Sequence, residues 1–191
     1  MTAAALPVWA EQLISEFDES DARVKALTAG LTTPQLNWHP QPGAWSIGQC
    51  IEHLAIANDI YIEAIAGALA NRQPDGPVDE IVLGRFSRYF LRTFIEPTPT
   101  TRRARAPRKI TPIAGALDST IVDRFVEGNV KVRAFVRRAA AYDVNRIRFK
   151  NPFIPVLRFT VGTGLKLHSS HERRHLLQAE RVKAASGFPS R

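Results

Sequence analysis

The sequence predicts an all-α protein folded as a four-helix bundle, with a long connection between its second and third helices. Two observations lead to this fold class. Four long segments carry apolar residues at helical spacing, and no segment shows the alternation of a convincing β-strand. With 191 residues, of which 45% are apolar and 23% charged, the chain can bury a hydrophobic core. We therefore expect residues 1–191 to form a single bundle domain.

The first two helices are predicted from their apolar spacing and their boundary residues. The first is expected over residues 6–29. Its inward residues are Trp9, Leu13, Phe17, Val24 and Leu27. The second begins at Ser46, because Ser46 and Gln49 have the spacing of a capping box, and it ends near Asn71. Its apolar stripe consists of Ile47, Ile51, Leu54, Tyr61, Ile65 and Leu69.

Residues 77–113 form the long connection and are interpreted as a variable, basic insertion or loop. Within it, residues 83–94 predict a short amphipathic helix that prolines interrupt on its C-terminal side. Arg102, Arg103 and Arg105 follow. This charged stretch is either a solvated loop or a basic lid that binds an anionic substrate, so the three arginines are candidate anion-binding residues.

The third and fourth helices complete the bundle. The third is expected over residues 118–142, and a connector over 144–155 carries two prolines. The inward residues of the third helix are Ile121, Phe125, Val132, Phe135 and Val136. The fourth helix begins between about residues 159 and 165 and runs to residue 185. We expect antiparallel order for most neighbouring helices.

Histidines on the second and fourth helices form a candidate metal site. His171 and His175 are spaced i, i+4, so both imidazoles project from one helix face, one turn apart. His53 on the second helix supplies a third imidazole if the two helices face each other. Three ligands leave positions open, as in catalytic metal sites. The donor set suits zinc, nickel, iron(II) or cobalt; the alternative is that these are hydrogen-bonded core histidines.

Five further residues are candidates for contacting the metal ligands or lining a pocket. They are His168, Gln178, Cys50, Ala57 and Tyr61. His168 is either a donor to the ligands or a residue near the helix start that lies closer to solvent. Cys50 is interpreted as a small core residue, with a fourth ligand or a reactive thiol as alternatives.

Three residues near the histidines are not expected to bind the metal ion or a substrate. Trp45 is expected to anchor packing at the start of the second helix rather than to touch a substrate. Glu52 and Glu172 each neighbour a histidine but point at another angle, so they are weak ligand candidates. No single carboxylate is marked as a general base.

The charge balance narrows the classes of partner. The chain has 26 lysines and arginines against 18 acidic residues, a net charge of +8. This favours an anionic ligand or an arginine-rich surface; nucleic acid binding is not expected, because no recognition motif is visible.

No apolar run approaches the ~20 residues of a membrane span, so no membrane partner is expected. Cytoplasmic location is expected because the start lacks a signal-peptide pattern, and the single cysteine excludes an internal disulfide.

Two segments resemble the signature of the DinB-like superfamily. The first enters the second helix and comprises Trp38, Pro40, Pro42-Gly43-Ala44-Trp45-Ser46-Ile47, Gln49 and Ile51-Glu52-His53-Leu54. The second comprises His171-Glu172-Arg173-Arg174-His175-Leu176-Leu177-Gln178 and Glu180-Arg181-Val182. The resemblance implies a four-helix bundle that binds one divalent metal ion through His53, His171 and His175.

The resemblance also implies a range of activities. Related families use low-molecular-weight thiols such as mycothiol, bacillithiol or glutathione, as transferases or isomerases. The leading hypothesis is therefore a metal-dependent, thiol-dependent transferase acting on a small-molecule substrate. Metal-dependent hydrolysis and a non-catalytic metal-binding or stress-response role are the alternatives. A homodimer is also expected.

Overall fold

The structure, a computed structural model, describes residues 5–97, 106–112 and 115–190. Four long helices form the core: α1 (Val8–Thr28), α3 (Ile47–Leu69), α5 (Thr120–Ala139) and α6 (Val161–Lys183). The shorter elements are α2 (Thr33–Leu36), α4 (Arg85–Phe90), the π-helical turn η1 (Leu91–Ile95), the 3-10 turn η2 (Arg108–Ile110) and the strands β1 (Arg148–Lys150) and β2 (Arg158–Thr160). The predicted all-α bundle is confirmed.

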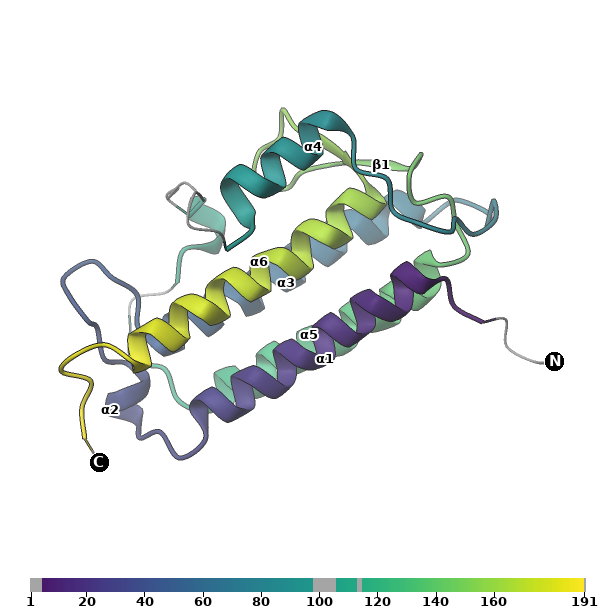
Figure 1. Ribbon diagram of the computed structural model, residues 1–191. Coiled ribbons are helices and arrows are strands. Elements are labelled where there is room, and N and C mark those ends of the chain that lie inside the picture. Colours follow the sequence, from purple (N-terminus) through teal and green to yellow (C-terminus); the bar gives the residue numbers. More distant parts are fainter. Residues whose placement is uncertain (1–4, 98–105, 113–114, 191) are drawn as a thin grey trace.

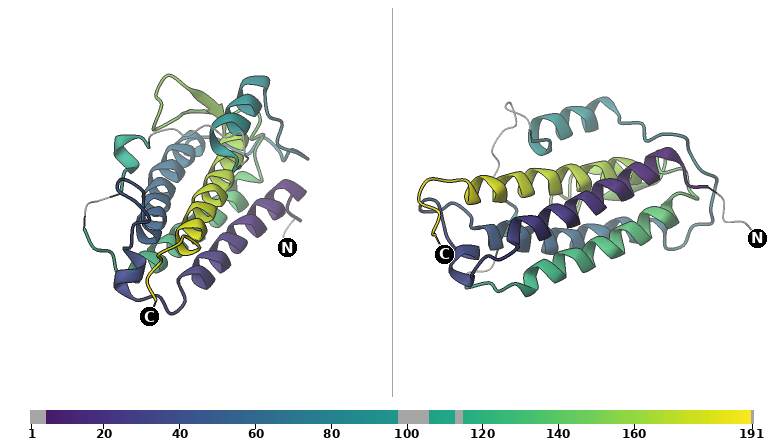
Figure 2. Two further views of the ribbon diagram at one scale, coloured as in Figure 1. Left: turned by 60° about the vertical axis from the view of Figure 1, so that its left-hand side comes forward. Right: turned by 60° about the horizontal axis from the view of Figure 1, so that its bottom comes forward.

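Each long helix packs against two others. Both α3 and α1 pack against α5 and against α6, so α1 and α3 lie diagonally across the bundle (Figures 1 and 2). The colours in Figure 1 show that α3 and α5 run in one direction, whereas α1 and α6 run in the other. The α3–α5 and α1–α6 contacts are therefore parallel. The expectation of antiparallel order for most neighbours is wrong, because the long connection returns to the end of the bundle where α3 began.

The long connection between α3 and α5 is confirmed and carries its own structure. The predicted helix over 83–94 is present as α4 followed directly by η1. This segment lies outside the four-helix core, over α6 (Figure 1). Within the described ranges, none of the helices combines the length and apolarity needed to cross a lipid bilayer.

The strands were not expected from the sequence. β1 and β2 form an antiparallel hairpin, in which Phe149 is paired with Phe159 and Lys150 with Arg158. Both phenylalanines are buried and pack with the bundle core, while the flanking cations face solvent. Each strand has three residues, too short for its alternation to be distinguished from a loop.

The apolar core is divided into two clusters along the bundle axis. One gathers around Trp9, Tyr61 and Phe149. The other gathers around Val24, Ile51 and Leu176. The capping box between Ser46 and Gln49 starts α3 as predicted, because the Gln49 N–H donates to Ser46 Oγ at 3.1 Å and the Ser46 N–H to Gln49 Oε1 at 3.2 Å.

Gly164 allows the hairpin to approach the start of α6. A Cβ atom at this position would lie 2.7 Å from Phe149 Cε1 and 3.1 Å from Ile65 Cδ1.

We predict that Gly164→Ala lowers the free energy of unfolding by about 1–3 kcal/mol, because the Phe149 ring must shift in a packed core. Gly67→Ala on α3 is the matched control, since its Cβ meets nothing within 4 Å and alanine favours helix. Urea unfolding of both variants checks this; equal stability would contradict it.

Candidate metal centre

The structure brings the three predicted histidines together at the α3–α6 contact. His53 extends from α3, and His171 and His175 extend from successive turns of α6. Their ligand atoms all lie within 4.8 Å of one another. The Nε2 atoms of His53 and His171 are 3.1 Å apart, and the ring centroids of His53 and His175 are 4.4 Å apart. The convergence requires α3 and α6 to be neighbours, as observed.

This arrangement fits a transition-metal ion. Zinc–imidazole bonds of about 2.0–2.1 Å at a tetrahedral angle place ligand nitrogens roughly 3.3 Å apart. The 3.1 Å separation of the His53 and His171 Nε2 atoms is close to this value. Among the described residues, no carboxylate oxygen or thiol joins the group of three. His53 is buried while His171 and His175 are half-buried, so two of the three residues keep some contact with solvent.

Hydrogen bonds orient two of the three imidazoles. His53 Nδ1 lies 2.6 Å from the carbonyl oxygen of Ile110, and His175 Nδ1 lies 3.0 Å from Gln178 Oε1. Each acceptor places the proton on Nδ1 and leaves Nε2 bare, which is the tautomer a metal ligand needs. Gln178 was a sequence candidate for this contact. Ile110 was not, because a backbone carbonyl carries no sequence signal.

Burial keeps the three imidazoles neutral. Desolvation lowers the pKa of His53 to about 4, although the hydrogen bond to Ile110 opposes this. Desolvation, and then the neighbouring histidines and Arg174, lower the pKa of His171 and His175 well below the usual value. Neutral imidazole is the form that coordinates metals, so the protein environment favours ligation over protonation.

Trp45 forms part of the site as well as anchoring the helix start. It packs against the second apolar cluster, as expected. Its ring centroid also lies 4.8 Å from that of His53 and 5.7 Å from that of His175. The indole therefore covers one side of the imidazoles.

The other sequence candidates lie elsewhere. Cys50, Ala57 and Tyr61 are buried inside the bundle, and desolvation raises the pKa of the Cys50 thiol to about 12. His168 is buried between the Phe17 and Tyr61 rings, at centroid distances of 5.5 and 5.6 Å, so its expected position nearer solvent is wrong. The candidate anion-binding residues Arg102, Arg103 and Arg105 lie outside the described residues.

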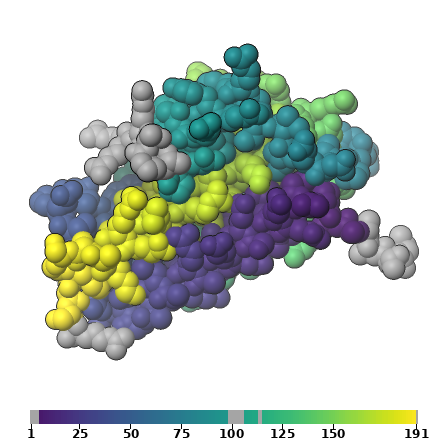
Figure 3. All heavy atoms as spheres, in the orientation of Figure 1, coloured from purple at the N-terminus to yellow at the C-terminus, as the bar shows by residue number. Residues whose placement is uncertain are grey.

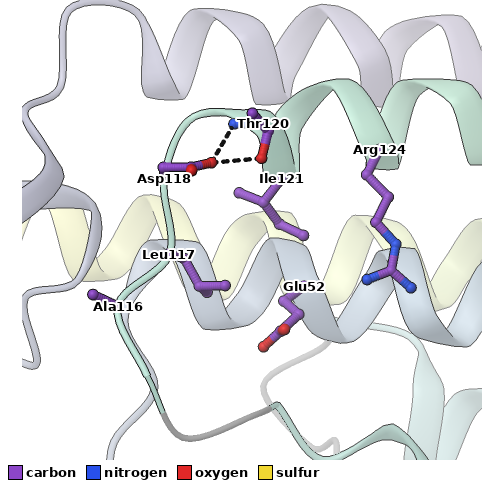
Figure 4. Close-up of a pocket in the computed structure, with 7 residues that line it drawn as sticks. All are labelled: Glu52, Ala116, Leu117, Asp118, Thr120, Ile121 and Arg124. Atoms are coloured by element: carbon purple, nitrogen blue, oxygen red, sulfur yellow. Dashed lines mark hydrogen bonds between the residues drawn. The ribbon is translucent and has the colours of Figure 1, made fainter.

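The two glutamates beside the histidines point away from them, as expected. Glu52 lines a pocket of about 260 Å³ between α3 and the start of α5, with Asp118 and Arg124 among its neighbours (Figure 4). Glu172 faces the bundle centre and is fully buried. Neither carboxylate belongs to the group of possible metal ligands.

Glu172 anchors a buried polar layer that sequence reasoning missed. It accepts hydrogen bonds from Asn58 Nδ2 at 2.9 Å and from Asn129 Nδ2 at 3.3 Å. Asn129 also donates to Asp21, and Asp21 pairs with Arg133 at 2.7 Å. Burial raises the pKa of Glu172 to about 8, although these donors oppose the rise. The sequence did contain a signal for this layer: in the apolar stripe of each long helix, one core position is occupied by a polar residue.

The fold and the histidine group define a helical bundle with a candidate metal centre at one helix pair. The sequence profile of the DinB superfamily matches residues 16–179, and the chain belongs to this superfamily. A search of curated proteins found no match.

One solved structure with this fold is that of YfiT from Bacillus subtilis, described as a probable metal-dependent hydrolase with an unusual four-helix bundle topology. Its sequence is 15% identical to this chain, and the TM-score is 0.60 over 99% of this chain and 94% of YfiT. At this identity, the similarity shows a shared fold.

His168 predicts a specific acid sensitivity of folding. Desolvation lowers its pKa from 6.5 to about 4, so the unfolded chain binds one more proton between these values. This histidine should therefore reduce stability as the pH falls from 6.5 to 4, by up to about 3 kcal/mol. His168→Phe preserves the ring contacts and should flatten the decline. Urea unfolding in chelator at pH 7, 5 and 4 measures it; identical pH slopes for the variant and the parent would contradict the prediction.

Proposed function

We propose that this protein is a divalent-metal-dependent enzyme acting on a small molecule, with His53, His171 and His175 as the metal ligands. The observation that carries the proposal is the convergence of three imidazoles, two of them held in the ligating tautomer, with no fourth ligand from the described residues. A structural metal site is usually closed by four protein ligands, whereas an open position admits a substrate. Membership of the DinB superfamily supports the proposal.

The protein residues have separable roles in such a site. Bound metal would lower the pKa of a coordinated water or thiol and so supply a nucleophile at neutral pH. Ile110 and Gln178 hold the imidazole rings of His53 and His175. Trp45 excludes water from one side. Arg174 adds positive charge within reach of His171 and His175, and it donates to the Phe94 carbonyl, which attaches η1 to α6 beside the site.

Our leading assignment is a transferase that uses a low-molecular-weight thiol. Hydrolysis by a metal-bound water is commonly assisted by a carboxylate that acts as a general base. Among the described residues, no carboxylate oxygen joins the three histidine nitrogens within 4.8 Å. A thiol needs less assistance, since its unperturbed pKa of about 8.5 is already near neutral. Arg102, Arg103 and Arg105, which lie outside the described residues, are proposed to bind a carboxylate-bearing thiol.

Metal-dependent hydrolysis is the second candidate, and the observation that favours it is the description of the YfiT structure. A site that binds metal without catalysis is the third alternative. The proposed metal is zinc, nickel, iron or cobalt, and the proposed form of the protein is a cytoplasmic homodimer.

Metal content tests the ligand set. We expect untagged protein to bind one transition-metal ion per chain, and His53→Ala and His171→Ala to lose it, because two remaining imidazoles hold a divalent ion weakly. His39→Ala is the matched control, since His39 is exposed on the loop before α3. Elemental analysis after dialysis against zinc, nickel, iron or cobalt gives the answer. Wild-type protein that binds none of these metals would refute the proposal.

Cobalt substitution tests the thiol assignment. We expect glutathione, mycothiol or bacillithiol to alter the visible spectrum of the cobalt-loaded protein and to raise its thermal stability, because a ligand that binds only the folded state stabilises it. The S-methylated thiol is the control, since it cannot form a thiolate. An unchanged spectrum and an unchanged melting temperature with every thiol would exclude the transferase and favour hydrolysis.

A further inference from the structure

The α4 segment and the β1–β2 hairpin form one continuous surface on the molecule. The Phe86 and Phe159 ring centroids lie 6.3 Å apart, and those of Phe90 and Phe159 lie 5.4 Å apart. Figure 3 shows the α4 segment in teal along the upper side of the molecule, with the green hairpin beside it. We call this region the α4–hairpin surface.

Exposed apolar side chains are concentrated on the α4–hairpin surface. Of the seven large hydrophobic side chains that are exposed in the described part of the chain, five lie here. These are Val82, Phe86, Tyr89, Ile154 and Val156. Val156 lies between the two strands and is 88% exposed. Exposed apolar groups gathered in one region, unlike scattered ones, indicate an interaction site.

The same surface is strongly basic. Residues 81–95 and 144–160 contain no aspartate or glutamate. Seven exposed cations lie on these segments: Arg85, Arg88, Arg92, Arg146, Arg148, Lys150 and Arg158. Arg146 pairs with Asp143 at 3.2 Å. The other six form no ion pair with a carboxylate of a described residue. The two segments therefore carry exposed positive charge and no carboxylate of their own.

The hairpin holds two of these cations in an unfavourable position. Lys150 and Arg158 are direct cross-strand partners, and both are exposed. Like charges opposite each other destabilise a strand pair. A bound anionic partner would neutralise them and remove this penalty.

We infer that the α4–hairpin surface binds membranes that contain anionic phospholipids. Apolar side chains that enter the region between headgroups and acyl chains, flanked by lysines and arginines that contact anionic headgroups, are the features of a peripheral membrane surface. Such binding needs no membrane-spanning helix, because the protein lies at the surface of the bilayer. The inference concerns a different surface from the metal centre and goes beyond the proposed enzymatic function.

Two other occupants fit these observations less well. A second copy of the chain would bring the same cations against each other, which opposes self-association. Single-stranded nucleic acid is bound by stacking bases on aromatic rings, whereas three of the five exposed apolar residues, Val82, Ile154 and Val156, are aliphatic.

Sedimentation with lipid vesicles tests the inference on the full chain. We expect the protein to bind vesicles made of equal parts phosphatidylcholine and phosphatidylglycerol, to bind phosphatidylcholine vesicles at least about tenfold more weakly, and to dissociate as salt is added. No binding to the mixed vesicles at low salt would overturn the inference, as would equal binding to both vesicle types.

Two substitutions separate lipid binding from folding. Lys150→Glu should lower the vesicle partition coefficient at least about fivefold. It should leave the free energy of unfolding unchanged or raised, because it places a carboxylate opposite Arg158. Val156→Asp should also reduce binding without loss of stability, since this side chain is almost fully exposed. Lys25→Glu on α1 is the matched control, with the same charge change at an exposed position away from the α4–hairpin surface, and should bind as the parent does.

Two further measurements test the rival occupants with the same variants. We expect light scattering to give the same mass for the parent and Val156→Asp. We also expect binding to single-stranded or duplex DNA to be weaker than binding to the mixed vesicles. A mass that halves in Val156→Asp would overturn the inference in favour of self-association. DNA binding that is tighter than vesicle binding and is lost in Lys150→Glu would overturn it in favour of nucleic acid.

Discussion

The buried carboxylate of Glu172 constrains how the four long helices meet. Asn58 on α3 and Asn129 on α5 donate to it, and Asn129 also reaches Asp21 on α1, so one polar residue from each helix meets at one level. A polar group in an apolar core costs free energy unless it is paired, so a rotation or a shift along the axis of any helix is penalised. Glu172 neighbours His171, and Asn58 lies little more than one turn beyond His53. The layer that aligns the helices therefore also aligns the imidazoles.

The long connection between α3 and α5 contributes directly to the candidate metal centre. Its η2 turn supplies the Ile110 carbonyl that orients His53, and its η1 turn is attached to α6 through Arg174 and Phe94. The same connection carries α4, which forms much of the basic and apolar outer surface. The connection between α3 and α5 is not needed to form the four-helix core. It nevertheless orients the candidate ligand His53 and presents a second candidate interaction site, and both roles depend on the way the connection folds back over α6.

The sequence predicted the parts of the fold that depend on local chemistry. Apolar spacing located the four long helices, and the Ser46 capping box located the start of α3. The i, i+4 spacing of His171 and His175 placed both imidazoles on one face before any partner was known. The hairpin was missed because three-residue strands carry too little pattern. One of the two interpretations of His168 placed it nearer solvent, and this was wrong because its burial depends on Phe17 and Tyr61, which belong to other helices.

Residue spacing by itself determined which residues form helices, which face of each helix is apolar, and which histidines are able to act as a group. These properties follow from the helical period and from end capping, which act over a few residues. Only the tertiary structure decided that α3 and α6 are neighbours, that a backbone carbonyl orients His53, and that Trp45 covers the imidazoles. It also decided that the gaps in four apolar stripes coincide in one polar layer. These features depend on the packing of distant segments, and helix direction and adjacency are set by that packing.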